Sequence, residues 1–376
     1  MRTFGVEEEL LIVDPATGQP AALADRMLAV TGRPPDMVRE FKLEQIEVQT
    51  PPCRDHDELL ECLYAGRQLA DRAARRCGGR VVALATSPMS SPTTLSPGDR
   101  YARMAEEFRL TSREQLTCGL HVHVGVASPD EGVAVLDRIR EWLPLVVALS
   151  ANSPFWFGDA TGYASYRTQA WNRWPSSGPQ ELYGRAAAYR ERIAAMIATG
   201  SIFDEAMAYF DARLSRNHPT VEVRVPDVPL VAGDSALFAV LVRALVETTA
   251  REAADGVAPL GTPVAVLRLA AWRASRSGLD GDLVHPVEGI PVPAGVAVEA
   301  LMAYIGPVLR DGGEYARTEL AVAELLARGS GERAQRQAAG KGGLAAVVEM
   351  ALSRTASPTG SWNDGARATL SIVRRR

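Results

Sequence analysis

Lysine is nearly missing from this chain of 376 residues, which contains only Lys42 and Lys341. Schiff-base and pyridoxal chemistry need a placed lysine, so this scarcity argues against both. Strong positive charge is also missing, because the formal net charge is −4 and no basic patch interleaved with aromatic residues occurs. The composition therefore gives no electrostatic case for binding nucleic acid.

Long apolar runs are absent as well. The best candidate, Leu143 to Ala151, is far shorter than the ~18 apolar residues that a membrane span needs. The start of the chain runs straight into acidic residues and lacks the apolar segment of a secretory signal. The four cysteines show no CxxC spacing, which favours free thiols in a reducing compartment. We therefore expect a cytoplasmic protein with no membrane partner.

The familiar phosphate-binding loops do not occur either. No GxxxxGK[ST] motif is present, and no GxGxxG motif follows a strand-like stretch, so any ATP must be held by metal ions and arginines. The hydrophobic fraction of 47% and charged fraction of 23% are typical of globular proteins. No repeat or linker clearly divides the chain, and we expect one domain over residues 1–376 with a helical part from about residue 234.

The most informative stretch that is present is Thr117–Val126, TCGLHVHVGV. Read as a strand, it places leucine and valines on one face and Gly119, His121, His123 and Gly125 on the other. Glycine allows close approach to the backbone, and histidine offers nitrogens to a metal or a proton to a phosphate. A solvated face with two incidental histidines is the alternative interpretation.

Three further stretches alternate in the same way and put charged groups on one face. These are Glu7 and Glu9 in Thr3–Val13, Glu47 with Glu44 in Glu40–Thr50, and Glu222 with Arg224 in Thr220–Val225. In the second stretch the apolar phase slips by one residue, which predicts a β-bulge near Gln45. Exposed strand ends and surface charge pairs are the alternatives for each stretch alone, and the role of Glu8 stays open.

Together the four stretches predict an antiparallel sheet with several carboxylates and two imidazoles on one face. Like charges cannot be packed together unless cations lie between them or some of the groups are protonated. Mostly oxygen ligands favour Mg²⁺ or Mn²⁺ over zinc, and such ions in a site of several carboxylates usually handle phosphate.

The segment Asn152–Gly178 shows no clear period and is dense in Trp, Tyr, Arg and Gly. A long loop of this composition is typical of a binding loop. Arg167 and Arg173 are our choices within it for contacts to a substrate carboxylate or a phosphate, because arginine binds both with two hydrogen bonds. Helices are predicted on both sides of this loop and through most of the chain after Asp234, and Ile202–Leu214 is among them.

Several of these motifs together resemble the carboxylate–amine ligase family related to bacterial glutamate–cysteine ligases, in the glutamine synthetase-like superfamily. The resemblance extends from the start of the chain to Gln337. Its motifs are GVEEE, EVQTPP, TCGLHVHVG, LSANSPFW, YRTQAWNRWPSSGP, VEVRVPD and RGSGERAQRQ.

This resemblance implies an α+β fold in which a curved antiparallel sheet, flanked by many helices, forms a funnel for metal and ATP. It further implies that Glu7, His121 and Glu222 hold one Mg²⁺ and that Glu9 and Glu47 hold another. By the same resemblance, His123 contacts ATP phosphates and Arg224 stabilises the transferring phosphoryl group. The role of Glu44 stays open.

The function implied is ATP-dependent ligation of a small-molecule carboxylate, with glutamate or a relative expected, to an amine such as cysteine through an acyl phosphate. Two alternatives remain at this stage. An HxH strand with scattered carboxylates also suits a metal-dependent amidohydrolase, and a non-catalytic nucleotide or metabolite sensor could keep the same scaffold. A helix-rich surface is compatible with a homodimer, but the sequence does not set the oligomeric state.

Overall fold

The computed structural model describes residues 2–357, so the last part of the predicted helical segment, residues 358–376, lies outside the described residues. Its main feature is an antiparallel seven-stranded sheet in the order β2-β3-β1-β5-β9-β8, with β4 pairing with β1. These strands are β1 Phe4–Val13, β2 Met37–Arg39, β3 Gln45–Gln49, β4 Arg80–Val82, β5 Leu120–Gly125, β8 Ala212–Leu214 and β9 Thr220–Val223. Two small hairpins join β6 Phe155–Trp156 to β7 Asp159–Ala160 and β10 Asp282–Val284 to β11 Pro291–Pro293.

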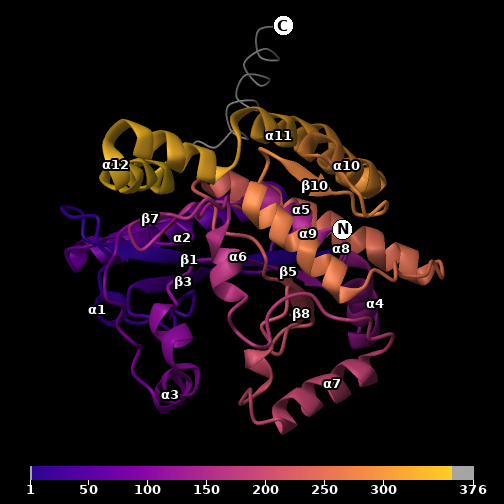
Figure 1. The fold of residues 1–376 in the computed structure, drawn as a ribbon, viewed down its shortest axis with the longest axis horizontal. Helices are drawn as coiled ribbons and strands as arrows, with labels where there is room; N and C mark the ends of the chain where they lie inside the picture. The colour runs from indigo at the N-terminus through magenta and orange to yellow at the C-terminus, as the bar shows by residue number, and fades with distance from the viewer. Residues whose placement is uncertain (1, 358–376) are drawn as a thin grey trace, which may run out of the picture.

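Helices lie on both sides of this sheet. In Figure 1, α8 lies on one side with α10, α11 and α12 beyond it, whereas α3 and α7 lie on the other side. Their bounds are α1 Ala24–Thr31, α2 His56–Arg76, α3 Asp99–Glu114, α4 Pro129–Ile139, α5 Leu143–Ser150, α6 Tyr166–Trp171, α7 Ala186–Ala198, α8 Ala232–Ala254, α9 Val264–Ser277, α10 Ala294–Asp311, α11 Tyr315–Arg328 and α12 Gly331–Ala356. A 3₁₀ turn spans Glu205–Met207. Among the described residues, no helix is both long enough and apolar enough to cross a membrane.

Local sequence signals explain several helix boundaries. The hydroxyl of Ser128 accepts a hydrogen bond from the Glu131 N–H at 3.1 Å, and Pro129 is the first residue of α4, as the capping pattern predicts. Pro144 lies in the first turn of α5, where a proline breaks no helical hydrogen bond, and α5 is therefore a separate helix from α4.

The apolar face of the sheet packs against α2, α4 and α8. Val122 and Val223, both fully buried, lie in one core cluster with the long apolar side of α8. Glu8 also lies on this face, where its carboxylate accepts hydrogen bonds from Arg67 at 2.7 and 2.8 Å and from Ser235 at 2.6 Å. Glu8 therefore belongs to a buried ion pair behind the sheet.

Two predicted elements differ from the structure. The segment Ile202–Leu214 is not a helix, because it forms the short 3₁₀ turn and then the edge strand β8. The segment Glu40–Thr50 is not one bulged strand, because residues 40–44 connect β2 to β3 and the strand begins only at Gln45. The one-residue shift in the apolar alternation therefore marks the point where the connection ends and β3 begins, and not a β-bulge. Residues 331–356 form α12, with a kink at Gly342 and Gly343.

Candidate active site

Strand register brings the predicted polar residues together on the other face of the sheet. Glu7 of β1 lies opposite His121 of β5, and Glu9 of β1 lies opposite Glu47 of β3. His123 lies opposite Glu222 of β9. Side chains that face each other across adjacent strands are close enough to interact directly.

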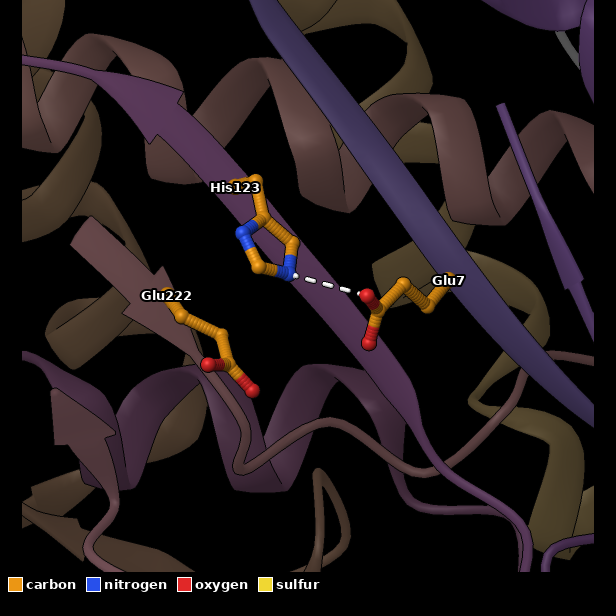
Figure 2. Close-up of side chains that lie close together, drawn as sticks. All are labelled: Glu7, His123 and Glu222. Atoms are coloured by element: carbon orange, nitrogen blue, oxygen red, sulfur yellow. Dashed lines mark ion pairs between the residues drawn. The ribbon is translucent and has the colours of Figure 1, made fainter. Parts of the chain in front are cut away.

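Figure 2 shows three of these side chains converging from adjacent strands. Glu7 Oε1 lies 3.4 Å from His123 Nε2, and Glu222 points into the same space. The other oxygen of Glu7 lies 3.2 Å from His121 Nδ1. Glu7 therefore bridges the two histidines. Burial alone would raise the pKa of Glu7, but hydrogen bonds and positive charge from both histidines lower it well below its usual value.

A second acidic group lies one strand further along the sheet. Glu40 joins Glu9 and Glu47 there, with one ligand atom from each within 4.8 Å of the others. Burial, followed by the charge of Glu9, raises the pKa of Glu40 to about 7. Burial and the neighbouring carboxylates, Glu7 first among them, also raise the pKa of Glu47 well above its usual value. The folded chain thus concentrates negative charge that it does not neutralise by itself.

The donor sets fit divalent cations. Three groups have ligand atoms that lie within 4.8 Å of one another: Glu7, His123 and Glu222; Glu7, Glu47 and His121; and Glu9, Glu40 and Glu47. The Nε2 atom of His121 is buried and has no hydrogen-bond partner among residues 2–357, and the buried Nε2 atom of His123 has only its 3.4 Å contact with Glu7. Oxygen-rich sets with at most one imidazole are typical of Mg²⁺ or Mn²⁺ sites.

This grouping differs in two respects from the one that the resemblance implied. Glu222 lies with His123, whereas the expected histidine was His121. Glu40 was not expected at the site at all. It precedes the strand, in the connection after β2, so alternation along β3 gives no signal for it.

Glu222 also lies between two arginines. One of its oxygens accepts a hydrogen bond at 2.7 Å from Arg213 Nε, and Arg224 donates to its other oxygen. Burial alone would raise the pKa of Glu222, but the charges of Arg224 and Arg213 lower it well below its usual value. Arg213 was missed in the sequence because its segment was expected to be helical; in an alternating strand it would have faced Glu222, its partner in the register.

Arg167 reaches the site from α6 and explains the glycine before the histidine strand. A Cβ atom on Gly119 would lie 2.2 Å from a terminal nitrogen of Arg167, so glycine leaves the room that this guanidinium occupies. Arg167 donates to the carbonyls of Arg224 and Val225, each at 3.2 Å. Its Nε is buried with no hydrogen-bond partner within the described chain.

Two other residues that were candidates from the sequence make their contacts away from this site. Arg173 forms an ion pair with Glu114 at the C-terminal end of α3. Glu44 turns away, because both its carboxylate oxygens accept hydrogen bonds from the Thr94 N–H, at 2.8 and 3.0 Å. Glu44 therefore anchors the segment that follows β4.

Three cavities meet at these residues. The carboxylate cavity, of about 270 Å³, is lined by the acidic residues of β1 and β3 and by aromatic residues that include Trp174 and Tyr209. The strand-end cavity, of about 220 Å³, borders Glu7 and His123 beside Gly5 and Thr220. The side cavity, of about 250 Å³, shares Arg167, Trp171 and Arg224 with the carboxylate cavity. The site therefore has room for more than one small molecule.

Comparison with known proteins identifies the family. Residues 3–350 match the family model described as glutamate-cysteine ligase family 2 (GCS2). This chain belongs to that family. A relative from Paenarthrobacter aurescens (strain TC1), named "Putative glutamate--cysteine ligase 2-3", is 55% identical over 340 residues, which are 90% of this chain and 80% of the relative. A second ligase-named relative from the same organism is 52% identical over 94% of this chain and 95% of its own length.

Solved structures share the fold at low sequence identity. A bifunctional glutathione synthetase from Pasteurella multocida has a TM-score of 0.71 and 15% identity over 95% of this chain, which spans about half, 52%, of that protein. A glutamate–cysteine ligase from Francisella tularensis, solved with AMP, has a TM-score of 0.69 and 13% identity over 100% of this chain and 94% of its own. The predicted α+β fold is confirmed.

Family membership also settles the class of activity. A member of glutamate–cysteine ligase family 2 is a carboxylate–amine ligase, an enzyme that forms C–N bonds. This confirms the predicted class, and the amidohydrolase and sensor alternatives find no support in these comparisons.

Proposed function

We propose that this ligase uses ATP to join the carboxylate of one small molecule to the amine of another, through an acyl phosphate. The names of its relatives make glutamate and cysteine the first pair to test. The AMP bound to the Francisella ligase supports a nucleotide substrate. Because ATP and free amino acids are plentiful in the cytoplasm, we place the reaction there.

The observation that carries the proposal is the convergence of acidic and imidazole groups on one face of the sheet with an arginine beside them. The acidic set fits two or more divalent cations, Mg²⁺ or Mn²⁺, held by Glu7, His123 and Glu222 and by Glu9, Glu40 and Glu47; His121 and Glu47 offer a further set with Glu7. When bound, such cations neutralise charge on the phosphate oxygens.

The strand-end cavity supports a position for the nucleotide. It combines apolar walls, among them Pro52 and Pro219, with Gly5 and Gly125, and His123 lies where this cavity borders the acidic residues. The Nδ1 atom of His123 lies 3.0 Å from the hydroxyl of Thr220, which fixes the ring and leaves Nε2 directed toward Glu7. We propose that the base of ATP lies in this cavity and that the phosphates extend past His123.

Arg224 supports the transfer of the phosphoryl group. Arg224 is 7% exposed and lines both the carboxylate and side cavities. Its Nε is one of the buried groups without a hydrogen-bond partner in the described residues. We propose that Arg224 donates to the phosphoryl group as charge develops on it, since a fixed donor in a water-poor site stabilises such charge strongly.

No nucleophile from the protein is needed, because the substrate carboxylate attacks the γ-phosphate and the amine then displaces phosphate from the acyl phosphate. The cysteines near the site fit this scheme. Burial raises the pKa of Cys53 to about 12 and that of Cys118 well above its usual value, so neither is a thiolate at neutral pH.

The test is ADP release by the purified chain with ATP, Mg²⁺, an acid and an amine from a screen of amino acids and amines. Release should require both the acid and the amine, and Glu222→Gln should lower turnover at least 100-fold without unfolding the protein. ADP release at full rate with the amine omitted would falsify coupled ligation. Wild-type turnover in Glu222→Gln would refute the role of that carboxylate.

A further inference from the structure

Four of the family motifs meet at one buried aspartate that the proposed mechanism does not use. Asp227 follows β9 in the motif VEVRVPD and is 1% exposed. Its oxygens accept hydrogen bonds from the hydroxyls of Ser153 at 2.7 Å and Ser165 at 2.9 Å, and from the Asn152 N–H at 2.8 Å. Asn152 and Ser153 belong to LSANSPFW, and Ser165 directly precedes YRTQAW. We call these four residues the aspartate hub.

The fourth motif, RGSGERAQRQ, reaches the aspartate hub from α12. The side-chain amide of Gln335 donates to the Asn152 carbonyl at 2.7 Å and to the Asn152 side-chain oxygen at 2.6 Å. The side-chain amide of Asn152 in turn donates to the carbonyls of Ala83 and Val228, at 3.0 and 2.7 Å. Asn152 and Gln335 are each 1% exposed. Because a buried network whose groups are hydrogen-bonded is rigid, the hub is a fixed point in the fold.

The aspartate hub places Arg167 at the start of α6. Ser165 caps this helix, because its hydroxyl accepts a hydrogen bond from the Thr168 N–H, and the Ser153 hydroxyl accepts one from the Arg167 N–H at 3.0 Å. The Arg167 guanidinium lies 3.9 Å from the Asp227 carboxylate. Burial raises the pKa of Asp227, and the charge of Arg167 opposes this more than any hydrogen bond does. One carboxylate therefore fixes both the start of α6 and the charge that α6 carries.

Arg167 in turn holds the backbone that carries Arg224. Its two terminal nitrogens donate to the carbonyls of Arg224 and Val225, each at 3.2 Å, and Gly119 leaves the room for this guanidinium. The Arg224 N–H is held separately, because it donates to the Asp211 carbonyl at 2.9 Å. The backbone of Arg224 is thus fixed at both its N–H and its carbonyl, which sets the direction of its side chain.

We propose that Asp227 and Arg167 are positioning residues for phosphoryl transfer, and that they act through the backbone of Arg224. Donors that stabilise charge in a transition state are effective only if they are fixed beforehand. A displacement of about 1 Å can cost about 100-fold in rate. This role differs from the direct contact with a carboxylate or a phosphate that the sequence suggested for Arg167. The proposal rests on the role of Arg224 proposed above and adds the residues that fix it.

The first test is the kinetics of Asp227→Asn and Arg167→Lys with ATP, Mg²⁺ and the acid and amine that support ADP release. Asp227→Asn removes the charge and keeps the shape of the side chain, whereas Arg167→Lys keeps the charge and loses the fork that holds two carbonyls. Each should lower kcat roughly 10- to 100-fold and change the KM of the acid and of the amine less than about threefold. The two variants disturb the pair from opposite sides, so the test stays decisive if one does not fold.

Asp137→Asn is the matched control. Asp137 is 3% exposed, its carboxylate accepts hydrogen bonds from the Tyr183 and Gly184 N–H groups at 2.8 and 2.7 Å, and it lines none of the three cavities. It is therefore a buried aspartate that also anchors a chain segment, but away from Arg224. Asp137→Asn should lower the melting temperature and leave kcat unchanged.

A double-mutant cycle separates positioning from a general loss of structure. In an Arg224→Lys background, Asp227→Asn should lower kcat less than about threefold, because the group through which Asp227 acts is already impaired. A general structural role predicts the same loss in both backgrounds.

The outcomes separate this proposal from the ligase function. Wild-type kcat in both variants, a KM of the acid or amine raised about tenfold, or equal losses with and without Arg224→Lys would each overturn the positioning role. Absence of ADP release by the wild-type chain with every acid and amine would instead refute the ligase function. Crystal structures of wild type and Asp227→Asn then decide the positioning without activity, because unmoved Arg167 and Arg224 side chains would overturn it.

Discussion

Divalent cations should stabilise this fold through the acidic face of its sheet, and Glu47 is the residue that tests this most directly. Glu47 belongs to two of the three candidate ligand groups, one with Glu7 and His121 and one with Glu9 and Glu40. Glu47→Gln removes a charge from both groups with almost no change in shape. It should therefore remove most of the stabilisation that Mg²⁺ confers.

The size of the effect follows from linkage. A ligand at 100 times its Kd stabilises the folded state by about 2.7 kcal/mol per site. Unfolding entropy of about 2.1 cal/mol/K per residue gives roughly 0.8 kcal/mol per degree for a chain of this length. Saturating Mg²⁺ at one site should thus raise the wild-type Tm by about 3 °C, and by more if two sites fill.

The assay is thermal unfolding followed by circular dichroism, with and without millimolar Mg²⁺ after chelation. In Glu47→Gln the shift should fall below about 1 °C, whereas the metal-free variant should melt no lower than wild type, because repulsion among the carboxylates is relieved. Glu44→Gln is the matched control, because Glu44 lies three residues away and is also buried, but its carboxylate accepts a hydrogen bond from the Thr94 N–H and belongs to none of the three ligand groups. A full Mg²⁺ shift in Glu47→Gln, or none in wild type, would refute the reasoning.

Three further predictions concern stability. Arg67→Met leaves Glu8 buried without its cation and should cost about 3–5 kcal/mol in urea unfolding; the double variant with Glu8→Leu should recover much of this, and equal losses in both would contradict the pairing. Burial lowers the pKa of His56 from 6.5 to about 4. Between these two pH values the unfolded chain binds a proton at His56 and the folded chain does not, so the free energy of unfolding should fall as the pH drops from 6.5 to 4. His56→Gln should reduce this fall by about 3 kcal/mol, measured by urea unfolding at several pH values. Gly119→Ala forces a methyl group against Arg167 and should destabilise the fold by about 1–3 kcal/mol, which an unchanged unfolding midpoint would disprove.

Period-2 alternation in the sequence was enough to predict three strands of the sheet and the facing of their polar residues. It succeeded for β1, β5 and β9 because one face of each strand packs in the apolar core and the other face carries the polar side chains of the site, so apolar and polar residues alternate along each strand. Glu8 broke the alternation because a buried arginine, 59 residues away, neutralises it. Such a pairing has no local signal in the sequence.

The two site residues that sequence reasoning missed lie where alternation gives no information. Glu40 occupies the connection after β2, and its approach to Glu9 depends on how that connection folds over the sheet. Arg213 lies in a three-residue edge strand, too short for a period to be recognised. Glu44 was expected on the same face as Glu47, but it lies in the connection before β3, and its hydrogen bonds from the Thr94 N–H hold it away from the site.

Burial of the apolar face of the sheet fixes the strand register, and this register brings the polar side chains of the other face together. Val6 pairs with Val122, which pairs with Val223, so three buried valines form one row across β1, β5 and β9. A slip of one residue in either pairing would turn this row toward the polar cavities and carry Glu7 into the core. The valines thus exclude the registers that are displaced by one residue from the one that sets Glu7 opposite His121. Repulsion among the carboxylates, which opposes this register, is outweighed by burial of the opposite face, and bound cations would turn that repulsion into attraction.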